Sequence, residues 1–354
     1  MNESLTIALI GCGRICKKHL EVLAELPRLT LVGVCDIKKD RADNVARAVG
    51  VPAFYDHVEM ARALKPTVVA VLTESGTHAD VASDVVPYTK HIIVEKPMAL
   101  TLASADKLIE VCEHAGVRLY VVKQNRYNRP VVRLRKALEA GRFGKIVLGT
   151  VRVRWCRDQG YYNLDPWRGT WAQDGGVFTN QASHHIDLLQ WMLGPVESVQ
   201  AYTTTALVDI ETEDTGIAIL RFASGALGVV EATTATRPRD LEGSLSLLGE
   251  KGSVVISGFA VNKMETWNFS EPLPEDATVF EDSVNPPNVY GFGHVEFYKD
   301  VLDCIARGRR PMLDGLEGRK SLELVIAIYD AAFSRSEIRM RYVPRNVPLG
   351  RREL

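Results

Sequence analysis

Two glycines and an aspartate near the start of the chain have the spacing of a dinucleotide site. In IALIGCGRICKKH, Gly11 and Gly13 stand where an apolar run gives way to a helical pattern, and Asp36 ends the next apolar run. Glycines at such a turn let main-chain amides approach a pyrophosphate, and a carboxylate at the end of the second strand can bind both hydroxyls of a ribose. That carboxylate would repel a 2'-phosphate, so the pattern favours NAD, although Lys38 and Lys39 leave NADP open.

The third position of this glycine pattern is Cys16, where glycine or alanine is usual. Cysteine is small enough for close helix packing, and a metal site at Cys12 and Cys16 would need further ligands, so we expect no metal. The alternative is an ordinary glycine turn with the aspartate as a helix cap. From this segment we predict cofactor contacts at Gly11, Gly13, Arg14, Ile15 and Asp36.

A lysine follows the apolar run in HIIVEKPMAL, residues 91–100. Lys96 lies at the carboxyl end of a predicted strand, and ligands of open parallel sheets bind outside these ends. The alternative is a solvated loop lysine paired with Glu95, which is the commoner role for such a residue. We keep Lys96 as a candidate catalytic residue.

A histidine lies in the late stretch GGVFTNQASHHIDLLQWM, residues 175–192. If a helix opens at the glycines, Asn180 and His184 share one face and Asp187 lies close to the same stripe. His185 then points about 100° away. A core histidine capped by Asp187 is the alternative, but we predict His184 as catalytic, with His185 as its main rival, and we count Asn180 among the catalytic residues.

These groups suit the oxidation of a secondary alcohol. The hydroxyl must lose a proton as hydride leaves its carbon for a nicotinamide, so a base has to reach the oxygen. His184 is the first choice of base. Lys96, partly desolvated beside a cationic ring, would share that proton or hydrogen-bond the hydroxyl.

Alternating strand and helix patterns in residues 1–123 predict the element that positions the glycine turn. We expect strands at TIALIG, LTLVGVCD, TVVAVLTE and HIIVE, with helices over residues 15–26, 38–50 and 79–86 between them. Alternation of this kind indicates parallel pairing with right-handed crossovers. The prediction is a doubly wound Rossmann sheet that binds NAD.

Residues 124–354 have a different pattern and are predicted to form a substrate-binding and oligomerisation domain of α+β class. Long strand candidates, KIVLGTVRVRW, TGIAILRF, GALGVVEATT and GSLSLLGEKGSVVIS, indicate an open, mostly antiparallel sheet. Turns are expected at Ser224-Gly225 and at residues 250–252. The proline-rich segment 268–293 reads as an extended surface loop, and two helices, over residues 294–307 and 316–335, close the chain.

Composition excludes several classes of partner. The chain has 43 basic and 44 acidic side chains, a net charge of -1, so no global field attracts nucleic acid or an anionic membrane. Its six cysteines are scattered and read as reduced thiols. The amino end lacks a signal pattern, and no apolar run is long enough to span a bilayer, so we expect a cytoplasmic protein.

GCGRI together with EKP resembles the glucose-fructose oxidoreductase, inositol dehydrogenase and rhizopine-catabolism (Gfo/Idh/MocA) family of NAD(P)-dependent oxidoreductases, over nearly the whole chain. The resemblance implies that Lys96 and His184 converge on nicotinamide and substrate. The family's D-x-x-x-H-x-x-D motif falls on Asn180, His184 and Asp187, and Asn180 is a departure because an amide cannot ionise. Further cofactor contacts implied by the resemblance are Thr73, Ser75, His78, Glu95, Lys96 and Gln124.

Within the family, KQNRYNRPV, WCRDQGYY and NPPNVYGFG look most similar to UDP-N-acetylglucosaminuronate (UDP-GlcNAcA) 3-dehydrogenases of bacterial lipopolysaccharide O-antigen biosynthesis. The resemblance implies oxidation at C3, a homotetramer paired through the open sheet, and in some members recycling of NADH by 2-oxoglutarate. Arginine guanidinium groups can bind a diphosphate and a carboxylate through paired hydrogen bonds, and tyrosines can stack on a flat base and donate from their hydroxyl groups. The predicted substrate-binding residues are Lys96, Arg126, Tyr127, Arg157, Tyr161, Arg168, Asn180, His184 and Tyr290, with Tyr162 as a further stacking face.

Two other classes of function stay open at this point. An inositol or simple-sugar dehydrogenase would keep the cofactor site but has no use for a diphosphate cleft, so binding of UDP separates the two. A cofactor-binding regulator of the same fold would be expected to lack the active lysine or histidine, and both Lys96 and His184 are present.

Overall fold

The computed structural model describes residues 5–284, 291–340 and 349–350. The chain forms two compact units. The first comprises Met1–Lys123 and His294–Arg319, and the second comprises Gln124–Gly293 and Lys320–Leu354. The return segment His294–Arg319 therefore packs with the first unit, whereas the sequence pattern groups it with residues 124–354.

The first unit is a Rossmann fold, as predicted. Its six parallel strands have the order β3-β2-β1-β4-β5-β6. They are β1 (Leu5–Ile10), β2 (Leu29–Cys35), β3 (Ala53–Phe54), β4 (Val68–Val71), β5 (His91–Val94) and β6 (Arg118–Val121). The central strands read as continuous apolar runs because helices cover both faces of the sheet.

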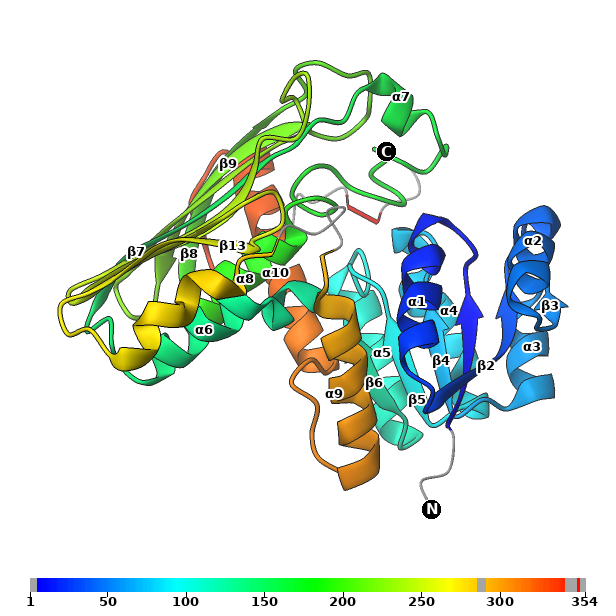
Figure 1. The fold of residues 1–354 in the computed structure, drawn as a ribbon. Helices are drawn as coiled ribbons and strands as arrows, with labels where there is room; N and C mark the ends of the chain where they lie inside the picture. Colours follow the sequence, from blue (N-terminus) through cyan, green and yellow to red (C-terminus); the bar gives the residue numbers. More distant parts are fainter. Residues whose placement is uncertain (1–4, 285–290, 341–348, 351–354) are drawn as a thin grey trace. The chain divides into compact units, whose positions relative to one another are not determined.

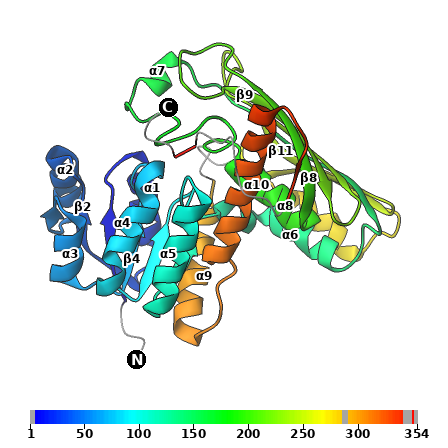
Figure 2. The ribbon, with the colours of Figure 1, turned by 180° about the vertical axis from the view of Figure 1, so that it is seen from behind.

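Helices α1 (Arg14–Glu25) and α9 (Gly293–Arg307) lie on one face of this sheet, and α4 (His78–Val85) and α5 (Leu102–His114) lie on the other (Figures 1 and 2). The remaining helices are α2 (Lys39–Val49) and α3 (His57–Leu64). The strand order reverses between β1 and β4, and ligands of such sheets bind outside the carboxyl ends of the strands at this point.

The second unit contains the predicted open, mostly antiparallel sheet. Its eight strands have the order β13-β12-β11-β7-β10-β9-β8-β14, and only β7 and β10 pair in parallel among the described strands. The strands are β7 (Ile146–Arg154), β8 (Val196–Thr204), β9 (Thr215–Phe222), β10 (Leu227–Thr233), β11 (Glu242–Gly249), β12 (Gly252–Ser257), β13 (Lys263–Phe269) and β14 (Ile338–Arg339). The turns expected at Ser224-Gly225 and at residues 250–252 connect β9 to β10 and β11 to β12.

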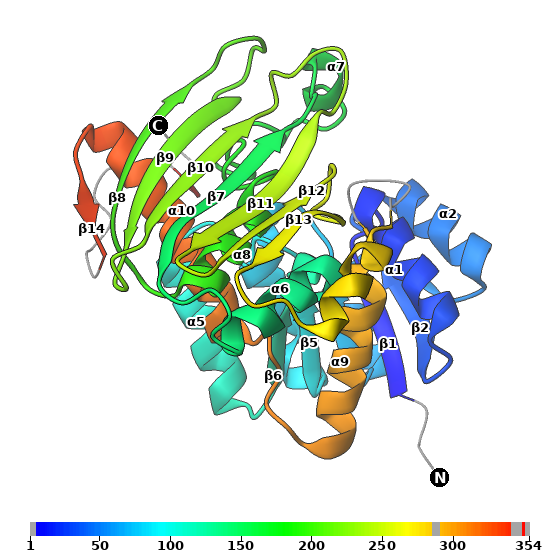
Figure 3. The ribbon, with the colours of Figure 1, turned by 60° about the vertical axis from the view of Figure 1, so that its left-hand side comes forward.

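One face of this sheet is covered by helices, and the other is open (Figure 3). The helix α8 (Ser183–Leu193) packs on β7, where a Cβ at Gly149 would meet Leu189 at 2.8 Å and Leu193 at 2.9 Å. The helices α6 (Arg129–Glu139) and α10 (Gly315–Ser334) complete the set, and α7 (Gln159–Tyr162) is a single turn. Close packing at this glycine fixes the position of the helix that carries His184.

Two local expectations need correction. The segment 268–293 is not wholly an extended loop, because the 3-10 helix η4 (Pro274–Asp282) lies within it, where Asp276 accepts a hydrogen bond from the main-chain nitrogen of Leu273. Strand β8 was not predicted, although its sequence VESVQAYTT alternates in burial. Among the described residues, no helix is long and apolar enough to cross a membrane.

Candidate active site

The glycine turn between β1 and α1 has the backbone conformation that a pyrophosphate site needs. Gly11 has φ +100°, and a Cβ there would lie 2.6 Å from the carbonyl carbon of Leu72. Only glycine tolerates both conditions. A Cβ at Gly13 would meet nothing within 4 Å, so space is open beside the first turn of α1, and the amino end of a helix attracts anions.

Asp36 lies directly after β2 and faces this turn. Its Oδ2 accepts a hydrogen bond from the Cys12 main-chain nitrogen at 2.8 Å, and its Oδ1 accepts one from Lys38, also at 2.8 Å. The carboxylate is thereby held beside the glycines, where a ribose would be bound. Cys16 is buried and fits the third position of the pattern. Turn, helix end and carboxylate together fit NAD.

The predicted residues Thr73, Ser75 and His78 lie after β4, around the short 3-10 helix η1 (Ser75–Thr77). His78 is buried, and its two ring nitrogens lie 2.7 Å from the Pro97 carbonyl oxygen and 3.0 Å from that of Thr73. Burial is the main cause that lowers the pKa of His78. In these contacts His78 ties the end of β4 to the segment that follows Lys96.

Lys96 is half-buried at the carboxyl end of β5. Its main-chain nitrogen donates a 3.0 Å hydrogen bond to Oε2 of Glu95. The Glu95 carboxylate is buried, and its other oxygen lies 3.0 Å from Nε2 of His19. The carboxylate predicted as a cofactor contact therefore faces protein groups.

His184 lies on α8 and is largely buried. Its Nε2 is 3.2 Å from Nε2 of Gln124, a residue of the 3-10 helix η3 (Gln124–Tyr127). This contact with η3 orients the His184 ring, and an oriented imidazole is the usual general base for a hydroxyl group.

The sequence predicts Asn180 within the helix, but α8 begins only at Ser183. Its main-chain nitrogen donates to the Gly176 carbonyl in the turns before the helix. Its side-chain Nδ2 donates to Oδ1 of Asp174, a buried residue whose Oδ2 accepts from the Gly169 main-chain nitrogen. Asp174 thus fixes the orientation of the Asn180 amide.

Arg126 forms a buried ion pair, which changes its expected role. Its Nε and Nη2 each donate to the Asp187 carboxylate at 2.8 Å, and its guanidinium lies 4.9 Å from the Trp191 ring centre. Both charged groups are at most 3% exposed. These contacts favour a structural role for Arg126 over direct substrate binding, and Asp187 pairs with the arginine instead of capping a histidine.

The structure does bring three other predicted substrate residues together. Two guanidinium groups flank the ring of Tyr161, that of Arg168 at 4.7 Å and that of Arg157 at 5.4 Å from its centre. Nη1 of Arg168 donates to the Tyr161 hydroxyl at 2.8 Å, and the rings of Tyr161 and Tyr162 meet edge to face. We call Arg157, Tyr161 and Arg168 the arginine–tyrosine cluster.

His185 and Tyr127 have different surroundings from the cluster. His185, the rival of His184, is fully buried, its ring is 5.9 Å from that of Trp155, and burial lowers its pKa to about 4. That core position disfavours His185 as the base. Tyr127 is half-buried at the end of η3, and Tyr290 lies outside the described residues.

Sequence reasoning missed Asp174, His19 and His294. Asp174 could have been noticed as the acid that precedes the glycine pair, whereas no sequence signal linked the two histidines. With Glu95 they form the one group, within the described ranges, whose side chains could hold a metal ion, and their ligand atoms lie within 4.8 Å of one another. No metal was expected from the sequence.

Comparisons with known proteins identify the family. Residues 5–123 match the oxidoreductase family with an NAD-binding Rossmann fold, and residues 131–255 match the GFO/IDH/MocA C-terminal domain. The chain is 27% identical to myo-inositol 2-dehydrogenase of Thermotoga maritima, over 96% of this chain and 99% of that protein. It is 24% identical to scyllo-inositol 2-dehydrogenase (NAD(+)) of Bacillus subtilis, over 92% and 94%.

Two solved structures are more similar. The WlbA dehydrogenase of Bordetella pertussis, in complex with NADH and UDP-GlcNAcA, is 42% identical with a TM-score of 0.93, over 96% of this chain and 99% of that one. The WlbA dehydrogenase of Chromobacterium violaceum, with the same ligands, is 39% identical with a TM-score of 0.91, over 96% and 97%. This chain belongs to the Gfo/Idh/MocA family of oxidoreductases and is an NAD-dependent dehydrogenase.

Proposed function

We propose that this protein oxidises the C3 hydroxyl of UDP-GlcNAcA to a ketone, with NAD as the hydride acceptor. The observation that carries the proposal is the similarity, over nearly the full length of both chains, to a WlbA dehydrogenase crystallised with NADH and UDP-GlcNAcA. The inositol dehydrogenases match at lower identity. The product would be a 3-keto sugar acid, an intermediate suited to amination in O-antigen synthesis.

The arginine–tyrosine cluster supports a nucleotide sugar acid as the substrate. Such a molecule carries a diphosphate, a carboxylate and a flat base, and guanidinium groups beside an aromatic ring suit all three. Arg157 is paired with Asp240 at 2.9 Å, and Arg168 lies 3.6 Å from Asp165. These carboxylates hold the guanidinium groups in place without removing their other N–H donors.

In the proposed reaction the carbon loses a hydride and the hydroxyl loses a proton. Bound NAD supplies the acceptor for the hydride. We assign His184 as the base because imidazole is the commonest general base and the rival His185 is fully buried. We assign Lys96 to hydrogen-bond the same hydroxyl, where its ammonium group would stabilise negative charge that develops on the oxygen.

A homotetramer paired through the open sheet is part of the proposal. The open face carries exposed apolar side chains, with Tyr202 80%, Ile219 55% and Ile217 50% exposed. Adjacent apolar residues on an uncovered sheet favour contact with another protein surface. Contact with a second copy of this chain would bury these residues, because each copy presents the same face.

The second candidate function is oxidation of inositol or a simple sugar, which the curated relatives favour. One sample of purified protein should be denatured to release and identify bound nucleotide. A second, native sample should be assayed for NAD reduction with UDP-GlcNAcA and with myo-inositol. Turnover of UDP-GlcNAcA and competition by UDP alone are expected. Turnover of myo-inositol with no effect of millimolar UDP would replace the first proposal by the second.

Variants of the two assigned residues test their roles. Lys96→Met and His184→Asn should each lower kcat by about 1,000-fold, the scale of a lost acid–base group, with NAD binding retained. The double variant should be little worse than either single variant, because both groups act on one proton. Addition of 2-oxoglutarate to the reduced enzyme then tests whether NADH is recycled in place.

A further inference from the structure

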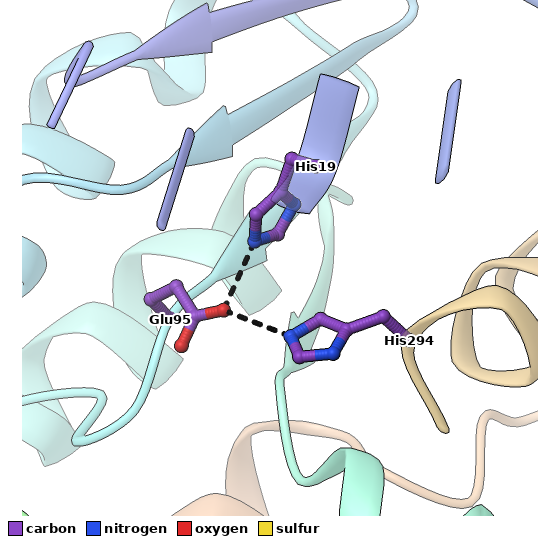
Figure 4. A group of neighbouring side chains, drawn as sticks. All are labelled: His19, Glu95 and His294. Atoms are coloured by element: carbon purple, nitrogen blue, oxygen red, sulfur yellow. Dashed lines mark hydrogen bonds and ion pairs between the residues drawn. The ribbon is translucent and has the colours of Figure 1, made fainter. Parts of the chain in front are cut away.

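Three buried side chains from distant parts of the sequence meet in the first unit (Figure 4). His19 comes from α1, Glu95 from the end of β5 and His294 from the start of α9. Oε1 of Glu95 is 3.0 Å from Nε2 of His19 and 3.6 Å from Nε2 of His294. The side chains of these residues are 0%, 7% and 1% exposed, so water does not satisfy the carboxylate.

Glu95 is ionised in this setting. Burial alone would raise its pKa, but hydrogen bonds and charge from His19 and His294 hold the pKa of Glu95 well below its ordinary value. A carboxylate only accepts hydrogen bonds, so Nε2 of His19 donates to it. Nδ1 of His19 lies 2.7 Å from the Tyr298 hydroxyl oxygen. Hydrogen bonds thus join Tyr298, His19 and Glu95 in a chain.

The other end of this chain is the residue assigned to catalysis. Oε2 of Glu95 accepts the main-chain N–H of Lys96 at 3.0 Å. The carboxylate is therefore fixed from one side by α1 and in turn fixes the backbone from which the lysine side chain extends. His19 lies five residues beyond the start of α1, the helix whose first turn follows the glycines.

We infer that Glu95 is a positioning residue, which sets the place of Lys96 relative to the cofactor helix α1 through the main-chain N–H of the lysine. The inference rests on the proposed function, because it acts through Lys96. It differs from the family expectation of a direct cofactor contact. Displacement of a catalytic group by about 1 Å lowers the rate by about 100-fold, so such a support has a measurable effect.

The same atoms could instead hold a divalent metal ion, but the contacts favour hydrogen bonding. The 3.0 Å separation of His19 and Glu95 is an ordinary hydrogen-bond length. The tyrosine on Nδ1 of His19 and the amide on Oε2 of Glu95 complete a consistent set of donors and acceptors. Zinc analysis of the purified protein distinguishes the two cases, and stoichiometric zinc that Glu95→Gln abolishes would overturn the inference.

The direct test measures the Lys96 amide itself, by hydrogen exchange with residue-level mass spectrometry. Glu95→Ala should speed exchange of that amide at least tenfold, because its acceptor is lost. Glu95→Gln should restore most of the protection, since the amide oxygen still accepts while His19 changes tautomer. Glu110→Ala, at an exposed position on α5, is the control and should change nothing. Unchanged Lys96 exchange in Glu95→Ala would overturn the inference whatever the substrate is.

Steady-state kinetics, with whichever substrate the wild-type protein oxidises, complete the test. Glu95→Ala should lower kcat by about 100-fold with KM and NAD affinity within roughly threefold, and Glu95→Gln should recover at least tenfold. In the Lys96→Met background Glu95→Ala should have little further effect, and a full additional loss there would overturn action through the lysine. If Glu95→Ala does not fold, Tyr298→Phe is the variant to measure. It is a milder change at the far end of the hydrogen-bond chain and should lower kcat severalfold.

Discussion

The Asn180 side chain is held by a buried carboxylate. The amide donates to Asp174, whose carboxylate is 1% exposed and has its second oxygen on the Gly169 main chain. A carboxylate at position 180, as the family motif has, would face Asp174 directly. Two carboxylates at hydrogen-bond distance must share a proton, which raises the pKa of one of them. The asparagine and Asp174 are therefore a matched pair.

Asn180→Asp should lower kcat/KM at least tenfold at neutral pH and reduce stability by about 1–3 kcal/mol, the scale of a lost buried hydrogen bond. Part of the loss should return at acidic pH, where the pair can share one proton. The double variant Asp174→Asn with Asn180→Asp restores a donor and an acceptor and should recover stability. Steady-state kinetics and thermal melts across pH check this, and a fully active, stable single variant would refute the pairing.

At the residue scale, we assign the choice of cofactor to Asp36. Asp36→Ala removes the carboxylate that the Cys12 and Lys38 main-chain amides hold beside the glycine turn. NAD affinity should fall about tenfold, and discrimination against NADP should shrink because a 2'-phosphate is no longer repelled. Titration with both cofactors measures the ratio, with Asp40→Ala on the exposed start of α2 as the control. An unchanged ratio would remove Asp36 from the ribose site.

At the scale of elements, the segment that leads into α8 is held by a second buried acid. Oε1 of Glu213 accepts from the Phe178 main chain at 3.0 Å and from the Tyr329 hydroxyl at 2.9 Å. The Tyr329 hydroxyl also accepts from Gly176 and Thr179. Burial raises the pKa of Glu213 to about 7 from its ordinary 4.5. This acid therefore titrates where most carboxyl groups are already charged.

The sign of its effect on stability follows from proton binding. Between pH 4.5 and about 7 the folded protein keeps a proton on Glu213 that the unfolded chain has lost, so stability falls as pH rises through this window. The full fall is about 3 kcal/mol at 1.36 kcal/mol per pH unit. Glu213→Gln should flatten that part of the curve, measured by denaturant unfolding at several pH values. Glu197→Gln, exposed on β8, should keep the wild-type slope, and equal slopes in all three proteins would contradict the assignment.

Local patterns predicted most of the elements and part of the site. Alternation of apolar strands and helices predicted the Rossmann order, and the glycines with Asp36 predicted the turn, because these signals lie within one strand–helix–strand stretch of sequence. The start of α8 differs from the prediction because the glycines at 175 and 176 do not open a helix, and the turns around Asn180 depend on the distant Tyr329 and Glu213. The ion pair of Arg126 could not be predicted, since its partner Asp187 is 61 residues away.

At the scale of the whole molecule, the open face of the eight-stranded sheet carries many exposed apolar side chains. Leu227 on β10 and Leu248 on β11 are 43% and 38% exposed, and both pair with Leu148 on β7. With the exposed residues of β8 and β9, they extend the apolar surface over five strands. The same face also carries ion pairs, which Arg152 and Arg154 form with Glu231 and Glu242. These charged groups would help to align two copies of the sheet.

Ile219→Asp places a charge in the centre of that face and should convert the proposed tetramer to a smaller species. The isolated chain should keep its fold, because the residue is 55% exposed and its side chain points away from the helices. Sedimentation velocity at several concentrations measures the change. Leu316→Asp, at an exposed apolar position on α10, should leave the assembly intact. A wild-type protein that sediments as a monomer would contradict the assignment of this face.

The return of His294–Arg319 to the first unit has a consequence for biosynthesis. A ribosome delivers all six strands of the Rossmann sheet first, and the 170 residues 124–293 must then follow before α9 emerges. Domains generally fold in order as they leave the ribosome, but here the earliest one lacks Tyr298 and His294 until late. A chain that stops anywhere in 124–293 leaves the first unit unfinished, so a truncated cofactor domain needs α9 supplied in order to be complete.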